Sequence, residues 1–289
     1  NQNTASGFGS MKLTTTGTQN TASGYYSMLD NTTGSYNTSF GVNSLANNTT
    51  ASYNTAIGLQ GLNSNTTGAR NTSSGAYSLK KNTTGNTNTA SGFKSLCATT
   101  SGCCNTASGG YSLLANTTGN ENTAFGTLAL HSNTTANYNT AVGFCAMHGN
   151  TTGTKNVAVG WKALRANTTG CLNTVIGMEA LKDNTTGCGN TSSGYYSMNE
   201  NETGCQNTGT GLCSIHSNTT GNNNTAAGAW SLLDNTTGCR NTAIGQSAME
   251  SNTTGCWNGA FGTKSLYANT TANFNTAVGG CTLFSNTTG

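Results

Sequence analysis

The sequence predicts an all-β fold, a single-chain parallel β-solenoid of 17 coils with 17 residues each. The first observation is a strict period, because Asn recurs every 17 residues from Asn3 to Asn275. The second is that Gly occupies two places in almost every repeat, which disfavours helices, and helix-pair repeats need about 33 residues or more. The third is that each repeat offers a single Leu-sized residue. A unit this short cannot fold alone, so coils must stack about 4.8 Å apart.

The repeat has the consensus N-T-A-x-G-x-x-[SA]-L-x-x-N-T-T-G-x-x, whose positions we number 0 to 16. The same position in successive repeats is called a column. Small or apolar residues at positions 2, 4, 7 and 8 predict a thin core of Leu, Ala, Ser and Gly. Positions 5, 6, 9, 10, 15 and 16 accept almost any residue and are expected to face outward. Residues 1–289 are expected to form one continuous solenoid with no internal boundary, a window of a longer periodic protein or filament.

Two Asn columns and two Gly columns punctuate the repeat. Amides at positions 0 and 11 are expected to stack on their own copies as hydrogen-bonded ladders, and Thr at positions 1, 12 and 13 can do the same. Gly at position 14, replaced by Ala in three repeats, predicts a turn with positive φ. Gly at position 4 predicts either a second bend or a close approach of backbones. The predicted structural ladders begin with Asn3, Asn20, Asn37 and Asn54 and with Gly7, Gly24, Gly41 and Gly58.

Position 3 alternates between Ser and large apolar residues such as Phe40 and Ile57. A column that accepts both is not expected to lie deep in a core. It predicts either a strip that packs against another chain on some segments only, or a partly buried position of loose volume.

The second Asn column begins an N-T-T or N-E-T tripeptide in 15 repeats, the acceptor pattern of N-linked glycosylation. Only Thr14 and Thr99 depart from it. The pattern predicts a row of covalent glycans along one edge, whereas an Asn that points inward could not be modified. The predicted acceptors are Asn31, Asn48, Asn65, Asn82, Asn116, Asn133, Asn150, Asn167, Asn184, Asn201, Asn218, Asn235, Asn252, Asn269 and Asn286, with scattered further sequons at Asn37, Asn47, Asn71, Asn190 and Asn223.

Eleven Cys residues indicate an oxidising compartment. Members of one column in successive coils should have Cα atoms about 4.8 Å apart, inside the range that a disulfide spans. Position 15 offers the predicted pairs Cys171–Cys188 and Cys239–Cys256, which a shift of four coils superimposes, and Cys188–Cys205 is the rival pairing. The spacing assigns no partner to Cys97, Cys103, Cys104, Cys145, Cys205, Cys213 or Cys281. Of these, the three at position 6 are expected to be free or to link neighbouring chains.

The composition predicts a protein that is not an enzyme. Eight acidic residues and three His are scattered over the repeats, so no catalytic, cofactor-binding or metal-binding cluster is expected. A net charge of +3 without a basic run gives little attraction for nucleic acid or an anionic membrane. No apolar run approaches the roughly 20 residues that span a bilayer.

The unit N-T-A-[IVF]-G-x-x-[AS]-L, seen at Asn54–Leu62, Asn122–Leu130 and Asn139–Met147, resembles the head repeat of trimeric autotransporter adhesins. It is also similar to repeats of phage and algal-virus fibre proteins. The adhesin resemblance implies a left-handed β-roll, association of three chains and binding to a host surface. The longer period, the N-T-T-G insert and the Cys content depart from the adhesin pattern and favour a secreted fibre of a eukaryote or its virus.

These observations predict a structural extracellular filament, secreted or on a virion surface, whose partners are copies of the same chain and covalent glycans. Coils would stack end to end under a coat of N-linked sugars. The alternative is an adhesin-like head that binds a host surface. A third hypothesis is ice binding by the Thr ladder of the N-T-T edge.

Overall fold

The computed structural model describes residues 2–288, and the elements in this part of the chain are 17 β-strands, without a helix. The predicted all-β parallel solenoid is therefore confirmed, with one three-residue strand per repeat at positions 1 to 3. The chain divides into two compact units, residues 1–142 and 143–289. The first unit holds β1 (Thr4–Ser6), β2 (Thr21–Ser23), β3 (Thr38–Phe40), β4 (Thr55–Ile57), β5 (Thr72–Ser74), β6 (Thr89–Ser91), β7 (Thr106–Ser108), β8 (Thr123–Phe125) and β9 (Thr140–Val142). The second holds β10 (Val157–Val159), β11 (Thr174–Ile176), β12 (Thr191–Ser193), β13 (Thr208–Thr210), β14 (Thr225–Ala227), β15 (Thr242–Ile244), β16 (Gly259–Phe261) and β17 (Thr276–Val278).

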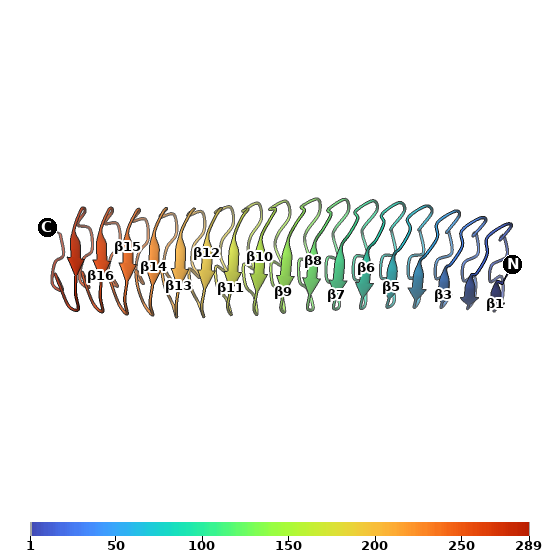
Figure 1. The fold of residues 1–289 in the computed structure, drawn as a ribbon, viewed down its shortest axis with the longest axis horizontal. Helices are drawn as coiled ribbons and strands as arrows, with labels where there is room; N and C mark the ends of the chain where they lie inside the picture. The colour runs from blue at the N-terminus through green and yellow to red at the C-terminus, as the bar shows by residue number, and fades with distance from the viewer. Residues whose placement is uncertain (1, 289) are drawn as a thin grey trace. The chain divides into compact units, whose positions relative to one another are not determined.

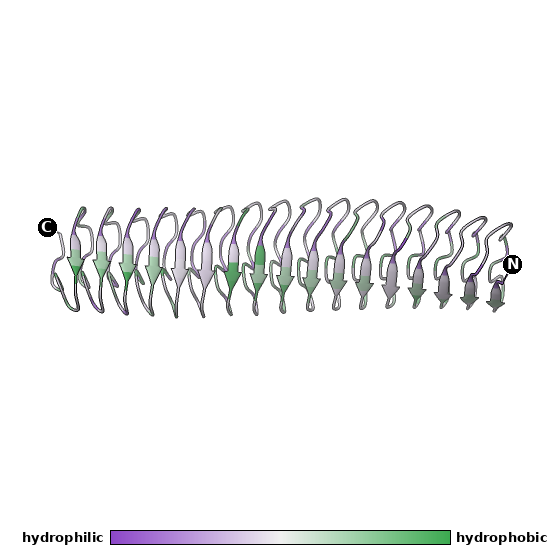
Figure 2. Ribbon diagram, in the orientation of Figure 1, coloured by the Kyte–Doolittle hydropathy of each residue, from purple (hydrophilic) through white to green (hydrophobic). Residues whose placement is uncertain are grey.

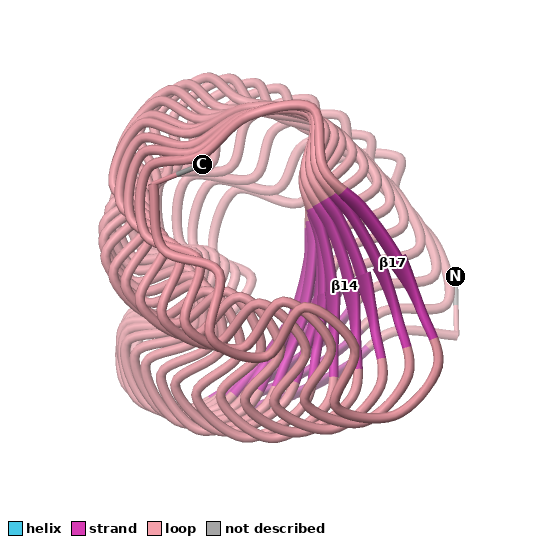
Figure 3. Ribbon diagram, turned by 90° about the vertical axis from the view of Figure 1, so that its left-hand side faces the viewer, coloured by secondary structure: helices cyan, strands magenta, loops and turns pink. Residues whose placement is uncertain are grey.

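Strands within each unit pair in parallel with a register of one repeat. In the first unit β1 pairs with β2, so that Ala5 lies opposite Ala22. In the second unit β10 pairs with β11, so that Ala158 lies opposite Val175 (Figure 1). The strand forms one side of each coil, and turns and loops form the remainder (Figure 3). Because a parallel strand pair needs a crossover between its strands, each 17-residue repeat supplies one strand and one return path.

The core is thin, as predicted, and one large side chain per coil fills it. The column at position 8 contributes fully buried Leu, Met and Ile residues, such as Met28, Leu45 and Ile215. The central strand residue adds a buried small side chain such as Ala22 or Ala56. Burial of one Leu or Met stabilises the fold by about 1.5–3 kcal/mol. Because each coil buries only one such side chain, its stability also depends on the residues around the core. Much of that surrounding is polar, because both Asn columns are also buried.

Coils are joined by backbone hydrogen bonds well beyond the strands. Tyr26 N donates to Phe8 O of the preceding coil at 2.9 Å, and Met28 N donates to Ser44 O of the following coil at 2.9 Å. Thr32 N reaches the carbonyl of Thr49 at 2.9 Å. The same pairs recur one repeat further on, so within each unit a coil is tied to its neighbour around most of its circumference.

Left-handed backbone falls on columns where the sequence does not suggest it. Tyr26, Met28 and Tyr36, at positions 6, 8 and 16, have φ of 53°, 54° and 60°. Such a conformation costs a non-Gly residue roughly 1–2 kcal/mol. Each of these three residues donates its N–H to an adjacent coil, at 2.9, 2.9 and 3.1 Å. The hydrogen bonds between coils therefore hold the chain in this conformation.

Different physical constraints select Gly at positions 4 and 14. Position 4 has positive φ, for example 138° at Gly24 and 133° at Gly41, and a Cβ there would also meet the next coil's backbone. Position 14 does not have the positive φ that we predicted for it. At Gly34 a Cβ would instead meet the carbonyl oxygen of Ala51 and lie 2.9 Å from Asn48 Nδ2. The prediction for this column was wrong because close packing, not backbone conformation, selects the small residue.

Candidate functional site

The second Asn column forms an amide ladder inside the coils. Asn48 Nδ2 donates to Asn31 Oδ1 of the preceding coil at 2.8 Å and to the carbonyl of Ala51 in its own coil at 3.0 Å. Asn65 repeats both bonds, each at 2.9 Å, with Asn48 and with Gly68. Both hydrogens of each amide nitrogen are thus engaged with protein, and these side chains are fully buried.

This geometry contradicts the predicted row of N-linked glycans. A sugar would replace one hydrogen of Nδ2 and would need a path to solvent, whereas these nitrogens are buried and donate twice. In this fold the side chains of the column have a structural role, because they hydrogen-bond one coil to the next. The fully buried members are Asn31, Asn48, Asn65, Asn82, Asn116, Asn133, Asn150, Asn167, Asn184, Asn201, Asn218, Asn235, Asn252 and Asn269. Asn286 is half-buried and donates to Asn269 at 3.0 Å. Of the scattered sequons, only Asn47 and Asn223 have exposed Asn residues.

The first Asn column makes a different ladder. The backbone N–H of Asn20 donates to Asn3 Oδ1 at 2.8 Å, and Asn20 Nδ2 crosses the coil to the carbonyl of Gly34 at 2.9 Å. Asn37 and Asn54 repeat the pattern. The carbonyl of Gly34 also accepts Asn31 Nδ2 at 2.9 Å. The two Asn columns therefore meet at the carbonyl of the second Gly column, which accounts for the lack of room there.

The ladder of the second Asn column is interrupted where Thr replaces Asn. Asn82 Oδ1 is buried and has no hydrogen-bond partner among the described residues, because Thr99 stands where the next amide would donate. On the other side Asn116 Nδ2 lies 3.4 Å from Thr99 Oγ1, a long contact. Thr14 Oγ1 is likewise buried without a partner in the described part of the chain.

Position 15 is more restricted than the sequence suggested. Its side chain accepts the backbone N–H of the same position in the preceding coil: Thr18 N donates to Ser35 Oγ at 3.0 Å. Cys205 N donates to Asn222 Oδ1 at 2.7 Å, and Cys188 N to Cys205 Sγ at 3.1 Å. The column is Ser, Thr, Asn or Cys in every repeat except at Ala69. That composition was the available signal, since all four are short side chains with an acceptor atom.

The Cys residues of this column come together in pairs. Cys171 Sγ lies 3.0 Å from Cys188 Sγ, and Cys239 Sγ lies 2.9 Å from Cys256 Sγ. The contact with Cys188, followed by burial, raises the pKa of the Cys171 thiol to about 11. Both pairs have their thiols free in this structure. The disulfides Cys171–Cys188 and Cys239–Cys256 stay predictions, as does the rival Cys188–Cys205, in which Cys188 N lies 3.1 Å from Cys205 Sγ.

Two hollows lie over the outward columns at positions 6 and 9. In the first unit a hollow is lined by Tyr77, Lys80, Lys81, Phe93, Lys94 and Cys97, which we call the basic hollow. In the second unit a hollow is lined by Trp230, Leu233, Gln246, Ser247, Glu250, Lys264 and Tyr267. These columns are variable and half-buried, so different coils of the same backbone present different side-chain chemistry.

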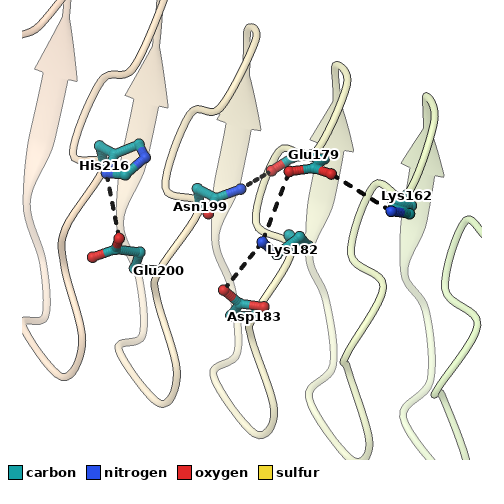
Figure 4. A network of polar contacts seen from close by, with 7 residues as sticks. All are labelled: Lys162, Glu179, Lys182, Asp183, Asn199, Glu200 and His216. Atoms are coloured by element: carbon teal, nitrogen blue, oxygen red, sulfur yellow. Dashed lines mark hydrogen bonds and ion pairs between the residues drawn. The ribbon is translucent and has the colours of Figure 1, made fainter.

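A polar network occupies the same columns elsewhere in the second unit (Figure 4). Glu179 lies between two lysines, 3.9 Å from Lys162 Nζ and 3.7 Å from Lys182 Nζ. Asn199 Nδ2 donates to the backbone carbonyl of Glu179 at 2.8 Å. A hydrogen bond to Glu179 raises the pKa of Tyr196 to about 12. Lys182 Nζ also lies 3.6 Å from Asp183 Oδ2, so two carboxylates offset the charges of the two lysines.

Apolar side chains at position 3, the last strand residue, and at position 5 form a strip on the outer face of the coils. In the first unit Phe40, Val42 and Ile57 are 41%, 43% and 45% exposed. In the second unit Ile176 is 50% exposed, and β10 and β11 are the most hydrophobic strands (Figure 2). The structure thus places the apolar members of position 3 on the outer face, which leaves contact with another chain as a proposal.

No family model matches the sequence, and no curated protein matches it either. Among residues 2–288, no group of three or more His, Cys, Asp and Glu side chains is placed to hold a metal ion. The same residues contain no helix with the length and apolar character needed to cross a membrane.

Proposed function

We propose that this chain is a non-enzymatic structural element of an extracellular filament, in which the coils of one copy stack on those of the next. The observation that carries the proposal is the repetition of one interface. Each coil donates forward from positions 1 and 8 and backward from positions 4 and 6, as at Thr21, Met28, Gly24 and Tyr26. The front of any coil is therefore complementary to the back of any other.

Such an interface is heterologous and does not close on itself, which is the geometry of open filaments. The pairing residues are also present in the first and last strands described, because β1 and β17 carry the same Thr-Ala-x sequence as interior strands. The paired thiols of the position 15 column support an oxidising location, since each pair can close to a disulfide between adjacent coils. The apolar strip is proposed as a lateral contact between rods.

Electron microscopy of the purified chain over a range of concentrations tests this proposal. We expect unbranched rods that lengthen with concentration and show an axial repeat near the strand spacing of about 4.8 Å. Thr276→Pro removes one forward-donating N–H and should shorten the rods, whereas Thr276→Ser keeps that N–H and should not. Folded, monodisperse chains at every concentration would refute the proposal, and rods unaffected by Thr276→Pro would refute end-to-end stacking.

Surface binding, as in an adhesin head, is the second candidate, and the hollows over positions 6 and 9 favour it. Ice binding by the N-T-T edge is less well supported. The hydroxyl of the first Thr of that edge is engaged, as when Thr32 Oγ1 donates to the carbonyl of Thr49 at 2.9 Å. It is therefore not available to order water.

A further inference from the structure

We propose that the basic hollow of the first unit binds an acidic sugar unit, sulfated or carboxylated, of a polysaccharide. The hollow is lined by three lysines, two aromatic rings and one thiol, without an acidic residue among them. This inference is independent of filament assembly, because it concerns the outer face of a few coils.

The net positive charge of the chain belongs to the unit that carries this hollow. The first unit has five Lys and Arg residues against two acidic residues, whereas the second has six of each. The net charge of +3 therefore belongs to the first unit, and three of its five cations line the basic hollow. Burial raises the pKa of Cys97, and the charges of Lys80, Lys81 and Lys94 oppose that shift, so all three ammonium groups act on this one side chain.

The second unit supplies an internal comparison at the same columns. Lys162 and Lys182 also occupy positions 6 and 9, but Glu179 lies between them and pairs with both. No ion pair in the described part of the chain involves Lys80, Lys81 or Lys94. Three half-buried or exposed ammonium groups without an acid favour an anion from outside the protein.

The aromatic rings of Tyr77 and Phe93 contact these ammonium groups and line part of the basic hollow. Lys80 Nζ lies 5.3 Å from the ring centroid of Tyr77, and Lys94 Nζ lies 5.3 Å from that of Phe93. The Phe93 and Tyr111 rings meet edge to face, 5.3 Å apart, and remain 42% and 36% exposed. Exposed ring faces beside fixed cations suit a ligand that has an apolar face and a negative group, as an acidic sugar has.

A nucleic acid also has negative groups and flat faces, but the charges do not continue as a track. Tight binding to nucleic acid rests on some 6–10 phosphate contacts along the strand. The other cations of the first unit are Lys12, which lies four coils away from Lys80, and Arg70, which lies at position 16 over the Tyr53 ring. One hollow with three lysines matches one or two charged sugar units better.

Titration of the full chain with a heparin-derived hexasaccharide tests the inference, with neutral dextran and a 12-nucleotide single-stranded DNA as comparison probes. Lys80→Gln/Lys94→Gln should weaken hexasaccharide binding at least about tenfold, which is 1.4 kcal/mol. Lys162→Gln/Lys182→Gln removes the same charge from the same columns and should change it less than twofold. Phe93→Ala should also weaken binding, and bound hexasaccharide should slow alkylation of Cys97 several-fold but not that of Cys281.

Equal losses in the two lysine double variants would show a general charge effect and overturn the inference. Unchanged affinity in Phe93→Ala would overturn the contact with a sugar face. Binding of the DNA as tightly as the hexasaccharide would assign the hollow to nucleic acid instead. Urea midpoints of all variants confirm that each remains folded, and rod formation does not enter any of these measurements.

Discussion

Thr99→Asn is expected to stabilise the first unit by completing the ladder of the second Asn column. Asn82 Oδ1 is buried without a partner, and the contact of Asn116 Nδ2 with Thr99 is 3.4 Å. At an intact junction the corresponding bond, from Asn48 to Asn31, is 2.8 Å. An unsatisfied buried acceptor costs about 1–3 kcal/mol, and a formed hydrogen bond contributes a net 0.5–1.5 kcal/mol, roughly. After some loss for fitting the longer side chain, the expected gain is about 1–2 kcal/mol.

Urea unfolding and residue-resolved hydrogen exchange measure this gain. We expect a higher urea midpoint and slower amide exchange in the coils that contain Asn82 and Asn116. Thr99→Val removes the hydroxyl without supplying an amide and should give no stabilisation. A midpoint that falls in Thr99→Asn, or exchange near Asn82 that does not slow, would show that the ladder is not limited by the missing donor.

Three further predictions concern the columns around this ladder. Leu79→Ala removes a fully buried side chain from a core with one large residue per coil, and the urea midpoint should fall by an amount equivalent to about 2–5 kcal/mol. Gly75→Ala, where φ is 143° and a Cβ would lie 2.5 Å from the next coil's carbonyl oxygen, should cost more than about 2 kcal/mol in the same assay. At Gly68 a Cβ would also meet the next coil's carbonyl oxygen, but φ is not positive and three repeats carry Ala in that column, so Gly68→Ala should cost less. In the reduced protein the raised pKa of Cys171, about 11 against an ordinary 9.0, means that the folded state holds the proton more tightly. Its contribution to stability is therefore complete below pH 9 and is lost as pH rises through about 11, and Cys188→Ser should flatten this decline in the urea midpoint.

The period made the fold predictable, because a strict repeat restricts every coil to one conformation. The core columns followed from their small and apolar residues, and Met28 and Ala22 are buried where the pattern placed them. The pattern could not locate the left-handed residues. Tyr26 and Met28 have ordinary side chains, and their positive φ arises from hydrogen bonds between coils that no single repeat contains.

The sequence predicted an amide ladder at Asn48 and its copies, but it did not decide between that ladder and a row of glycans. A glycosylation sequon requires only an Asn and a hydroxyl residue two places on, and the ladder tripeptide contains both by coincidence. In the structure the first Thr of the tripeptide also joins the coils, because Thr32 Oγ1 donates to the carbonyl of Thr49 in the next coil. The available signal was the strict 17-residue recurrence of the whole tripeptide, because polar columns in register are more typical of a ladder than of a modification site.

The Asn columns also explain how a chain with so thin a core keeps its register. In most sheets a one-residue slip is opposed by large apolar side chains that would turn outward. Here a slip would separate Asn65 from Asn48 and leave buried amide groups unpaired, at about 1–3 kcal/mol for each group. Most junctions between coils carry both Asn ladders, the second being interrupted where Thr14 and Thr99 replace Asn, so the penalty recurs along each unit. The amides therefore specify the register that the single Leu of each coil is too small a core to fix alone, and the same specificity would align the coils of one copy with those of the next.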